Sequence, residues 1–190
     1  MKTRYAVLIG VVFIVVGMIL LSSILKSQQN NQVVAPLSAS TSVAKAHIIQ
    51  SNYIQGMPSE LILPSLNLDI SVIPGVYNTR TKEWTLSLDK VQYAVMTPPP
   101  NNEEGNTFIY GHYRPGVFAT LHAIQVGAPA VVKTTNGHSF YYQLASIRTT
   151  NPSDTSIFSY QGKPIMTIQT CTGLFFQNRQ LFTFNLVRVV

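Results

Sequence analysis

From residue 57 to the C-terminus, the sequence alternates between short apolar runs and residues that form turns. The runs are shorter than typical globular helices, several of them alternate apolar and polar residues, and β-branched and aromatic side chains are common in them, which is typical of β-strands. We predict eight strands, at residues 61–63, 68–73, 84–88, 107–110, 130–134, 139–147, 165–170 and 181–189. This segment therefore predicts an all-β fold, either a sandwich or a closed barrel.

Residues that interrupt strands lie between these runs, as a chain of short strands requires. Pro74-Gly75 follows one run, and Asn136-Gly137 separates two others. Asn-Gly between two alternating runs is a strong signal for a tight β-hairpin. Within residues 57–190, the only segment that favours a helix is residues 118–124, and no internal repeat is present. We therefore expect one or two short helices beside the strands.

The N-terminus carries a separate signal. Residues 5–25 contain no charged side chain. A helix of that length, rising about 1.5 Å per residue, matches a hydrocarbon core about 30 Å thick. Lys2 and Arg4 precede the run, which places the N-terminus in the cytoplasm and the remainder outside the cell. A cleaved signal peptide or a buried soluble helix would also be apolar, but the first has a shorter apolar region and the second shows a polar stripe.

These patterns divide the chain into three parts. Residues 1–27 form a cytoplasmic tip and a transmembrane signal anchor, residues 28–56 form a flexible linker rich in Gln, Asn, Ser, Ala and Thr, and residues 57–190 form the folded domain. A coil of the linker's length has an end-to-end distance of about 30 Å, which is enough to lift a domain clear of a membrane.

The net charge of +6 is unevenly distributed. Four basic residues precede residue 57, whereas from there onward nine basic residues face all seven acids, which leaves only +2. This is no basic patch for nucleic acid, and no nucleic-acid-binding motif accompanies it. The excess belongs to the N-terminal segment, where anionic lipid head groups account for it.

Cys171 is the only cysteine of the chain. Outside the cell it cannot form an internal disulfide, so it is buried and inert, paired between chains, or kept for chemistry. In a strand, Cys171 would lie on the opposite face from the apolar residues Met166 and Ile168, and Arg179 on the opposite face from Phe182. The side chains of Cys171 and Arg179 should therefore point away from the interior. The histidines show no metal-ligand spacing, and we expect no metal or cofactor.

Several motifs occur in an order that resembles the sortases, membrane-anchored cysteine transpeptidases of Gram-positive-type cell surfaces. The resemblance covers residues 57–190. Its motifs are Gly105-Asn106-Thr107-Phe108-Ile109-Tyr110-Gly111-His112, Phe118-Ala119-Thr120-Leu121, Gly127 with Val131, Thr167-Ile168-Gln169-Thr170-Cys171, and Arg179 at the start of the last strand. The resemblance implies a closed eight-stranded β-barrel.

The resemblance also implies roles for individual residues. Cys171 would be the nucleophile, His112 the general acid and base, and Arg179 the residue that positions the scissile peptide and stabilises the oxyanion. Thr170 would add a substrate contact. A cationic neighbour favours the thiolate, and a guanidinium stays charged and presents several donors to an oxyanion.

Three further residues have competing interpretations. His122 and His138 compete with His112 for the role of the base. Asp154, in an Asn-Pro-Ser-Asp sequence, is best explained by turn chemistry, with a histidine-orienting role left open.

The activity that the resemblance implies is cleavage of an LPxTG-like C-terminal sorting signal between Thr and Gly through a thioacyl intermediate. The partners would be secreted proteins that carry this signal, an amine acceptor from a peptidoglycan precursor or a pilin, and the membrane. The pattern is nearest to classes D, E and F, without the calcium-binding loop of some class A members. Two alternatives stay open: an L,D-transpeptidase-like cell-wall enzyme, and a non-catalytic surface module for adhesion or interaction.

Overall fold

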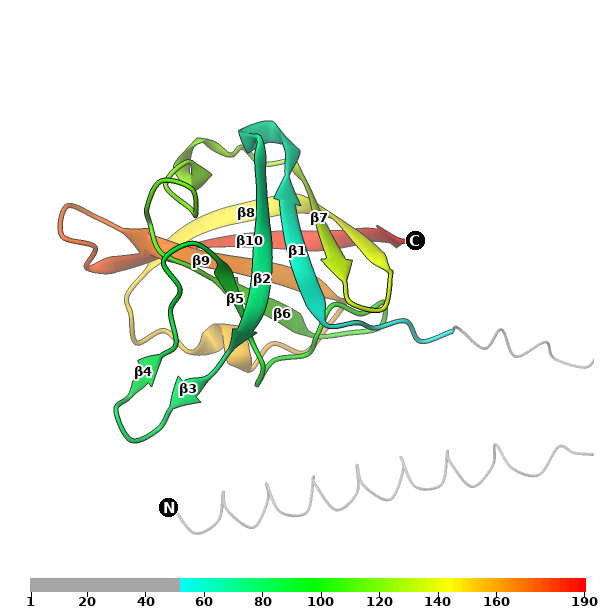
Figure 1. Cartoon of the computed structure of the whole chain (residues 1–190), viewed down its shortest axis with the longest axis horizontal. Helices are drawn as coiled ribbons and strands as arrows, with labels where there is room; N and C mark the ends of the chain where they lie inside the picture. The colour runs from blue at the N-terminus through cyan, green and yellow to red at the C-terminus, as the bar shows by residue number, and fades with distance from the viewer. Residues whose placement is uncertain (1–51) are drawn as a thin grey trace, which may run out of the picture. The chain divides into compact units, whose positions relative to one another are not determined.

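The computed structural model of the chain describes residues 52–190, which contain ten strands and three single-turn 3₁₀ helices (Figure 1). The elements are β1 (Pro58–Leu63), η1 (Pro64–Leu66), β2 (Leu68–Gly75), β3 (Tyr77–Asn78), β4 (Glu83–Trp84), β5 (Val91–Ala94), β6 (Asn106–Tyr110), η2 (Leu121–Ala123), β7 (Pro129–Thr134), β8 (Ser139–Thr150), η3 (Ser156–Phe158), β9 (Ile165–Thr172) and β10 (Asn178–Val189).

Eight of the strands close into a barrel in the order β1-β2-β5-β6-β9-β10-β8-β7. The pairs β2–β5 and β6–β9 are parallel, and the other six are antiparallel. The long strands β8 and β10 pair along most of their length, whereas β3 and β4 form a separate hairpin that projects from the barrel (Figure 1). The predicted closed, eight-stranded, all-β architecture is confirmed.

One predicted barrel strand is wrong. Of residues 84–88, only Trp84 is in a strand, and that strand pairs with β3 outside the barrel. A turn ends the extended run, because the Ser87 hydroxyl donates to Asp89 and accepts the Lys90 N–H. The barrel strand is instead β5, whose four residues are all buried. The alternation of Val91, Gln92 and Tyr93 covers too few residues to mark a strand in the sequence.

The barrel interior holds the main core. In β10, Phe182 and Phe184 are fully buried there, and β9 contributes Met166 and Ile168. These are the residues whose alternation placed them inside. The opposite face of the same two strands, which carries Cys171 and Arg179, therefore points away from the barrel interior.

The predicted hairpin is confirmed, and the predicted helix is shorter than expected. Gly137 lies in the left-handed region at φ 88° between β7 and β8, where glycine is favoured. Within residues 118–124, only Leu121–Ala123 form a helical turn. A segment of seven residues is too short to sustain an α-helix on its own local preferences.

The start of the described chain packs beside the barrel. Ile54 N–H donates to Asn102 Oδ1 over 2.8 Å, and Gly56 N–H donates to the carbonyl of Pro100 over 3.1 Å. The predicted membrane helix, and the linker up to residue 51, lie outside the described residues. Within residues 52–190, no helix has both the length and the apolar character needed to cross a membrane.

Candidate active site

The outer face of β6, β9 and β10 positions the candidate residues. Cys171 on β9 lies directly opposite Arg179 on β10, so the two side chains leave the sheet on the same side. Tyr110 on β6 lies opposite Gln169, two residues before the cysteine. The alternation of three neighbouring strands thus presents one continuous surface outside the barrel.

Cys171 is a free, half-buried thiol near the end of β9. It belongs to neither of the two buried hydrophobic clusters, whereas Ile168 on the other face of the strand lies in the main one. The expectation that this cysteine avoids the interior is confirmed. A half-buried thiol that lines a pocket can be reached by a reactant, as nucleophilic chemistry requires.

His112 lies just beyond β6, at the point where that strand leaves β9. Gly111 N–H donates to the carbonyl of Gln169 over 3.2 Å. The carbonyl of His112 then accepts the N–H groups of Arg114 at 3.0 Å and Phe118 at 3.2 Å. Because Phe118 is fully buried in the barrel core, this turn fixes the backbone that carries His112.

Thr170 connects the two segments that carry the histidine and the cysteine. Its side chain is buried, and its hydroxyl donates to the carbonyl of Gly111 over 3.1 Å. Thr170, which directly precedes Cys171, is therefore hydrogen-bonded to Gly111, which directly precedes His112. This hydroxyl is used within the protein, so a substrate contact at this position would come from the backbone.

Arg179 is the second residue of β10 and is half-buried. Its Nη1 donates to the carbonyls of Phe176 and Asn178, each over 3.1 Å. It takes part in none of the ion pairs found among the described residues. Its charge is therefore not neutralised by a carboxylate there, and its remaining donors can serve an anion in the pocket.

His112, Thr170, Cys171 and Arg179 all line one pocket of about 410 Å³. The structure thus brings together the four residues to which the resemblance assigns roles. Neither competing histidine lines it: His122 is exposed with Nδ1 2.6 Å from the carbonyl of Ala119, and His138 belongs to the β7–β8 hairpin.

A second pocket, of about 590 Å³, adjoins the first and shares Lys82, Trp84, Gln169 and Arg179 with it. Together the two pockets form a groove that runs from the candidate residues toward the segment between β8 and β9. An extended peptide of several residues can therefore lie across Cys171 with one side in this groove.

Trp84 forms part of the wall of this groove, and sequence reasoning missed it. Its ring stacks on Phe158 at 5.9 Å and 15°, and meets the edge of Tyr110 at 5.0 Å. Phe108 also contacts Trp84 edge-on at 6.4 Å, and Trp84 and Phe158 pack against a second buried cluster to which Phe108 and Tyr110 belong. An isolated tryptophan in a run interpreted as a strand gave no signal for a groove wall.

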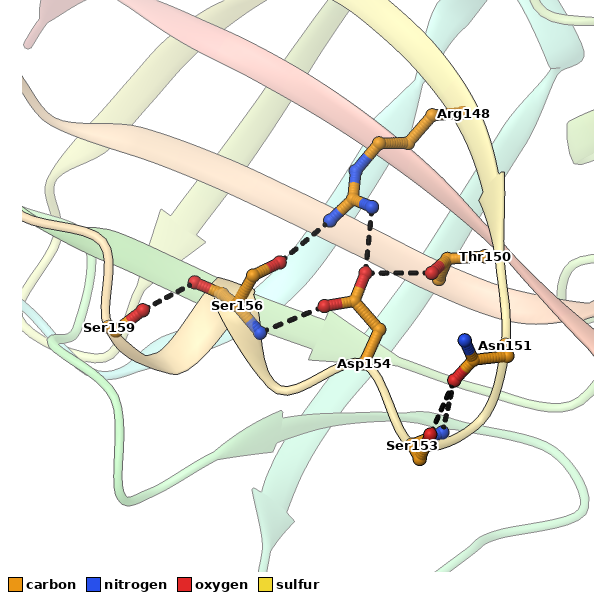
Figure 2. Close-up of polar contacts among 7 residues, drawn as sticks. All are labelled: Arg148, Thr150, Asn151, Ser153, Asp154, Ser156 and Ser159. Carbon is orange, nitrogen blue, oxygen red and sulfur yellow. Dashed lines mark hydrogen bonds and ion pairs between the residues drawn. The ribbon is translucent and has the colours of Figure 1, made fainter.

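The segment between β8 and β9 is held by Asp154 (Figure 2). Its carboxylate accepts Arg148 Nη1 and Thr150 Oγ1, each at 2.7 Å, and Ser156 N–H at 2.9 Å. Hydrogen bonding by Ser156, and then by Thr150 and Arg148, lowers the pKa of Asp154 below its ordinary value. Asp154 is therefore bonded within its own turn, which confirms the turn interpretation, and its carboxylate is not used to orient His112.

Within residues 52–190, no group of three or more His, Cys, Asp and Glu side chains converges in a way that could hold a metal ion.

Comparison with known proteins identifies the family. The family model described as Sortase domain matches residues 61–187, which span the barrel from β1 to β10. The chain belongs to the sortase family. No match to a curated protein is found.

Solved sortases of several classes share this fold. Sortase E1 from Streptomyces coelicolor, with a tripeptide in the active site, is 25% identical, with a TM-score of 0.55 over 71% of this chain and 90% of that one. Streptococcus agalactiae sortase C1, in complex with MTSET, is 20% identical, with a TM-score of 0.56 over 69% of each chain. A Clostridium perfringens sortase D5 transpeptidase is 24% identical, with a TM-score of 0.54 over 70% and 79%. At these identities the last two likenesses concern the fold alone.

Proposed function

We propose that this sortase is a cysteine transpeptidase that cleaves an LPxTG-like C-terminal sorting signal between Thr and Gly. The observation that carries the proposal is the shared pocket, in which His112, Cys171 and Arg179 converge from three separate segments. Their order in the sequence matches the motifs of the family, and their geometry gives each a distinct chemical task.

In the first step, the Cys171 thiolate attacks the carbonyl carbon of the scissile peptide. A carbon–sulfur bond forms, and the carbonyl oxygen becomes an oxyanion, which Arg179 stabilises with donors not used on Phe176 and Asn178. When the carbon–nitrogen bond breaks, protonated His112 gives its proton to the leaving amine. The products are a thioester on Cys171, neutral His112 and the released C-terminal peptide.

In the second step, an amine acceptor attacks the thioester carbonyl. Neutral His112 takes the proton of the attacking amine, the carbon–sulfur bond breaks, and the thiolate and the protonated histidine are restored. The transferred protein is thereby joined to the acceptor by a new amide bond. We propose an acceptor from a peptidoglycan precursor or a pilin, and no cofactor takes part in either step.

The similar sortases support this assignment. Sortase E1 is described with a tripeptide in its active site, and sortase D5 is described as a transpeptidase. In the present protein, the groove beside Cys171 offers an aromatic wall at Trp84 and Phe158 for apolar side chains of a bound peptide.

The alternatives are less well supported. A non-catalytic surface module predicts a buried and inert Cys171, whereas the thiol is half-buried and lines a pocket. An L,D-transpeptidase would set its cysteine in a Ser-x-Gly-Cys sequence, whereas the residues here are Gln169-Thr170-Cys171. The match to the Sortase domain model also argues against an L,D-transpeptidase.

We further propose a single-pass membrane protein with a cytoplasmic N-terminus and an extracellular catalytic domain. This rests on the uncharged run at residues 5–25 and on the two basic residues before it. Secreted substrates would then meet the enzyme on the extracellular side of the membrane that anchors it.

Mass spectrometry of the protein incubated with a panel of LPxTG-like peptides tests the proposed function. Without an amine, the protein should gain the mass of the peptide's acyl part, and an added amine should remove this adduct and form an amide product. Cys171→Ala should form neither. Peptide cleavage by Cys171→Ala, or a wild-type protein inert toward the whole panel, would contradict the proposal.

A further inference from the structure

The turn between β9 and β10 exposes three large apolar side chains. Leu174 is 91% exposed, Phe175 is 87% exposed and Phe176 is 52% exposed. We call these three residues the apolar tip. Residues at the centre of a turn are commonly Gly, Pro, Asn, Asp or Ser, and adjoining exposed apolar side chains commonly mark an interaction surface. The apolar tip therefore needs a partner.

The apolar tip is held in its outward conformation. Phe176 N–H donates to the carbonyl of Gly173 over 3.1 Å and closes the turn. Phe175 N–H donates to Gln177 Oε1 over 3.0 Å, and the ring of Phe176 lies 5.8 Å from the ring of Tyr113. The turn is thus ordered by its own contacts while Leu174 and Phe175 remain in solvent.

The segment that contains the apolar tip, and the segment of Tyr113 that contacts it, carry only positive charges. The oppositely charged pair Lys82 and Glu83 lines the adjoining pocket of Cys171. Residues 112–126 and 170–180 contain no Asp or Glu, and Arg114 and Arg179 are their only Lys or Arg residues. Phenylalanine and leucine enter the apolar side of a membrane interface, whereas tyrosine and arginine favour its head-group side. An apolar tip bordered by Tyr113 and an arginine suits a bilayer surface with anionic lipids.

The chain is long enough to bring the apolar tip to a membrane that also holds the N-terminal run. The tip and the start of the described chain lie at opposite ends of the barrel (Figure 1). Residues 26–51 separate the apolar run from the first described residue and span up to about 85 Å when extended. The twelve residues of β10 span about 40 Å, so the linker can follow the barrel from one end to the other.

We infer that the apolar tip inserts into the outer surface of the membrane that anchors the protein. Leu174 is three residues from Cys171, so this contact would place the mouth of the pocket that contains Cys171 close to the bilayer surface. The inference rests on the proposed membrane anchoring, but it is independent of the proposed transpeptidation.

A site-specific fluorescence experiment on the full chain tests this contact. In a Cys171→Ala background, an environment-sensitive NBD label is attached to Phe175→Cys or, in a matched control, to Val187→Cys. Val187 lies on β10 and is also exposed, at 62%, but it is about 30 Å along the strand from the tip. The labelled proteins are reconstituted in vesicles of phosphatidylcholine and phosphatidylglycerol, with or without spin-labelled lipids.

The label at position 175 should show blue-shifted emission and strong quenching by the spin-labelled lipids, and the label at 187 should show neither. Adding Leu174→Ser should reduce the quenching at 175. Equal, unquenched spectra at both positions in protein that floats with the vesicles would overturn the inference alone. Failure to float would overturn the anchoring and the inference together. A blue shift at 175 that needs a high protein-to-lipid ratio would assign the tip to a second copy of the chain and also overturn the inference.

Discussion

Replacing Asp154 by Asn should loosen the segment that forms one wall of the groove. The substitution preserves size but removes the charge that Arg148 and Thr150 contact at 2.7 Å (Figure 2). Asparagine has only one side-chain oxygen, and an NH₂ group replaces the other carboxylate oxygen. This NH₂ group must face hydrogen-bond donors, which are either Arg148 and Thr150 or the Ser156 N–H. One side of the network is therefore lost in either orientation.

The expected loss of stability is modest. A hydrogen bond to a charged group contributes about 1.5–3 kcal/mol. The side chain of Arg148 is 46% exposed, so its ion pair is screened and adds at most about 1 kcal/mol. The amide retains part of the network, which leaves a net loss of about 1–2 kcal/mol. For a domain of this size, that corresponds to a fall in Tm of about 3–8 °C, measured by calorimetry.

The effect on activity should appear in KM. Pro152, Thr155 and Phe158 line the groove, and a loss of about 1 kcal/mol lowers the ratio of ordered to disordered conformers of this segment about fivefold. We expect KM for a cleaved peptide to rise by up to about fivefold and kcat to stay within about twofold. Glu60→Gln is the matched control, because Glu60 pairs with Lys133 at 3.0 Å on the β1–β7 side and lines neither groove pocket.

The pH dependence gives the sign of the electrostatic contribution. The folded protein lowers the pKa of Asp154, so the ionised carboxylate stabilises the fold. This stabilisation is fully present above the ordinary Asp pKa of about 3.9. It is lost as the pH falls through the lower pKa of the folded state. The Tm difference between the wild type and Asp154→Asn should be constant from about pH 5 to 8 and shrink below about pH 4. Equal Tm and KM for the two proteins near neutral pH would refute the reasoning.

Three further predictions concern the catalytic residues, the core and the topology. In peptide transfer assays, His112→Ala should lower kcat/KM about 10² to 10⁴-fold and Arg179→Ala about 10² to 10³-fold, whereas the His122→Ala control should change it little; equal loss in His112→Ala and His122→Ala would show that the base is wrongly assigned. Phe182→Ala, which empties a fully buried site in the barrel, should cost about 3–5 kcal/mol in chemical denaturation, and a loss below about 1 kcal/mol would contradict the assigned core. On intact cells, an impermeant maleimide should label Cys171, and labelling only after lysis would contradict an extracellular domain.

The barrel was predictable because most of its strands carry a period-two pattern. Phe182 and Phe184 alternate with more polar neighbours, and the Asn136-Gly137 turn fixes the register of the β7–β8 pair. β5 was missed because it has only four residues, so the alternation of Val91, Gln92 and Tyr93 is too short to mark a strand. The extended run that replaced it in the prediction begins at Trp84 but ends at the turn held by Ser87.

The site was predictable for a different reason. His112, Cys171 and Arg179 lie in short motifs close to strand ends, so local sequence identifies them without a three-dimensional fold. The walls of the groove come from Trp84 and from the segment between β8 and β9, and no local pattern connects these parts. Their meeting depends on long-range packing, because Trp84 and Phe158 both contact Phe108 of β6.

The two faces of β9 and β10 divide stability from chemistry. On the inner face, Ile168 and Phe182 are paired across the strands and fully buried, and their contacts hold the barrel closed. On the outer face, Cys171 and Arg179 are also paired, but both are half-buried and project into the groove. Since a strand places successive side chains on opposite faces, a slip of one residue in β9 would move the thiol into the core and Ile168 into the groove. The inner-face packing therefore maintains the register that the proposed chemistry requires, and substitutions of Arg179 should reduce activity while the barrel stays folded.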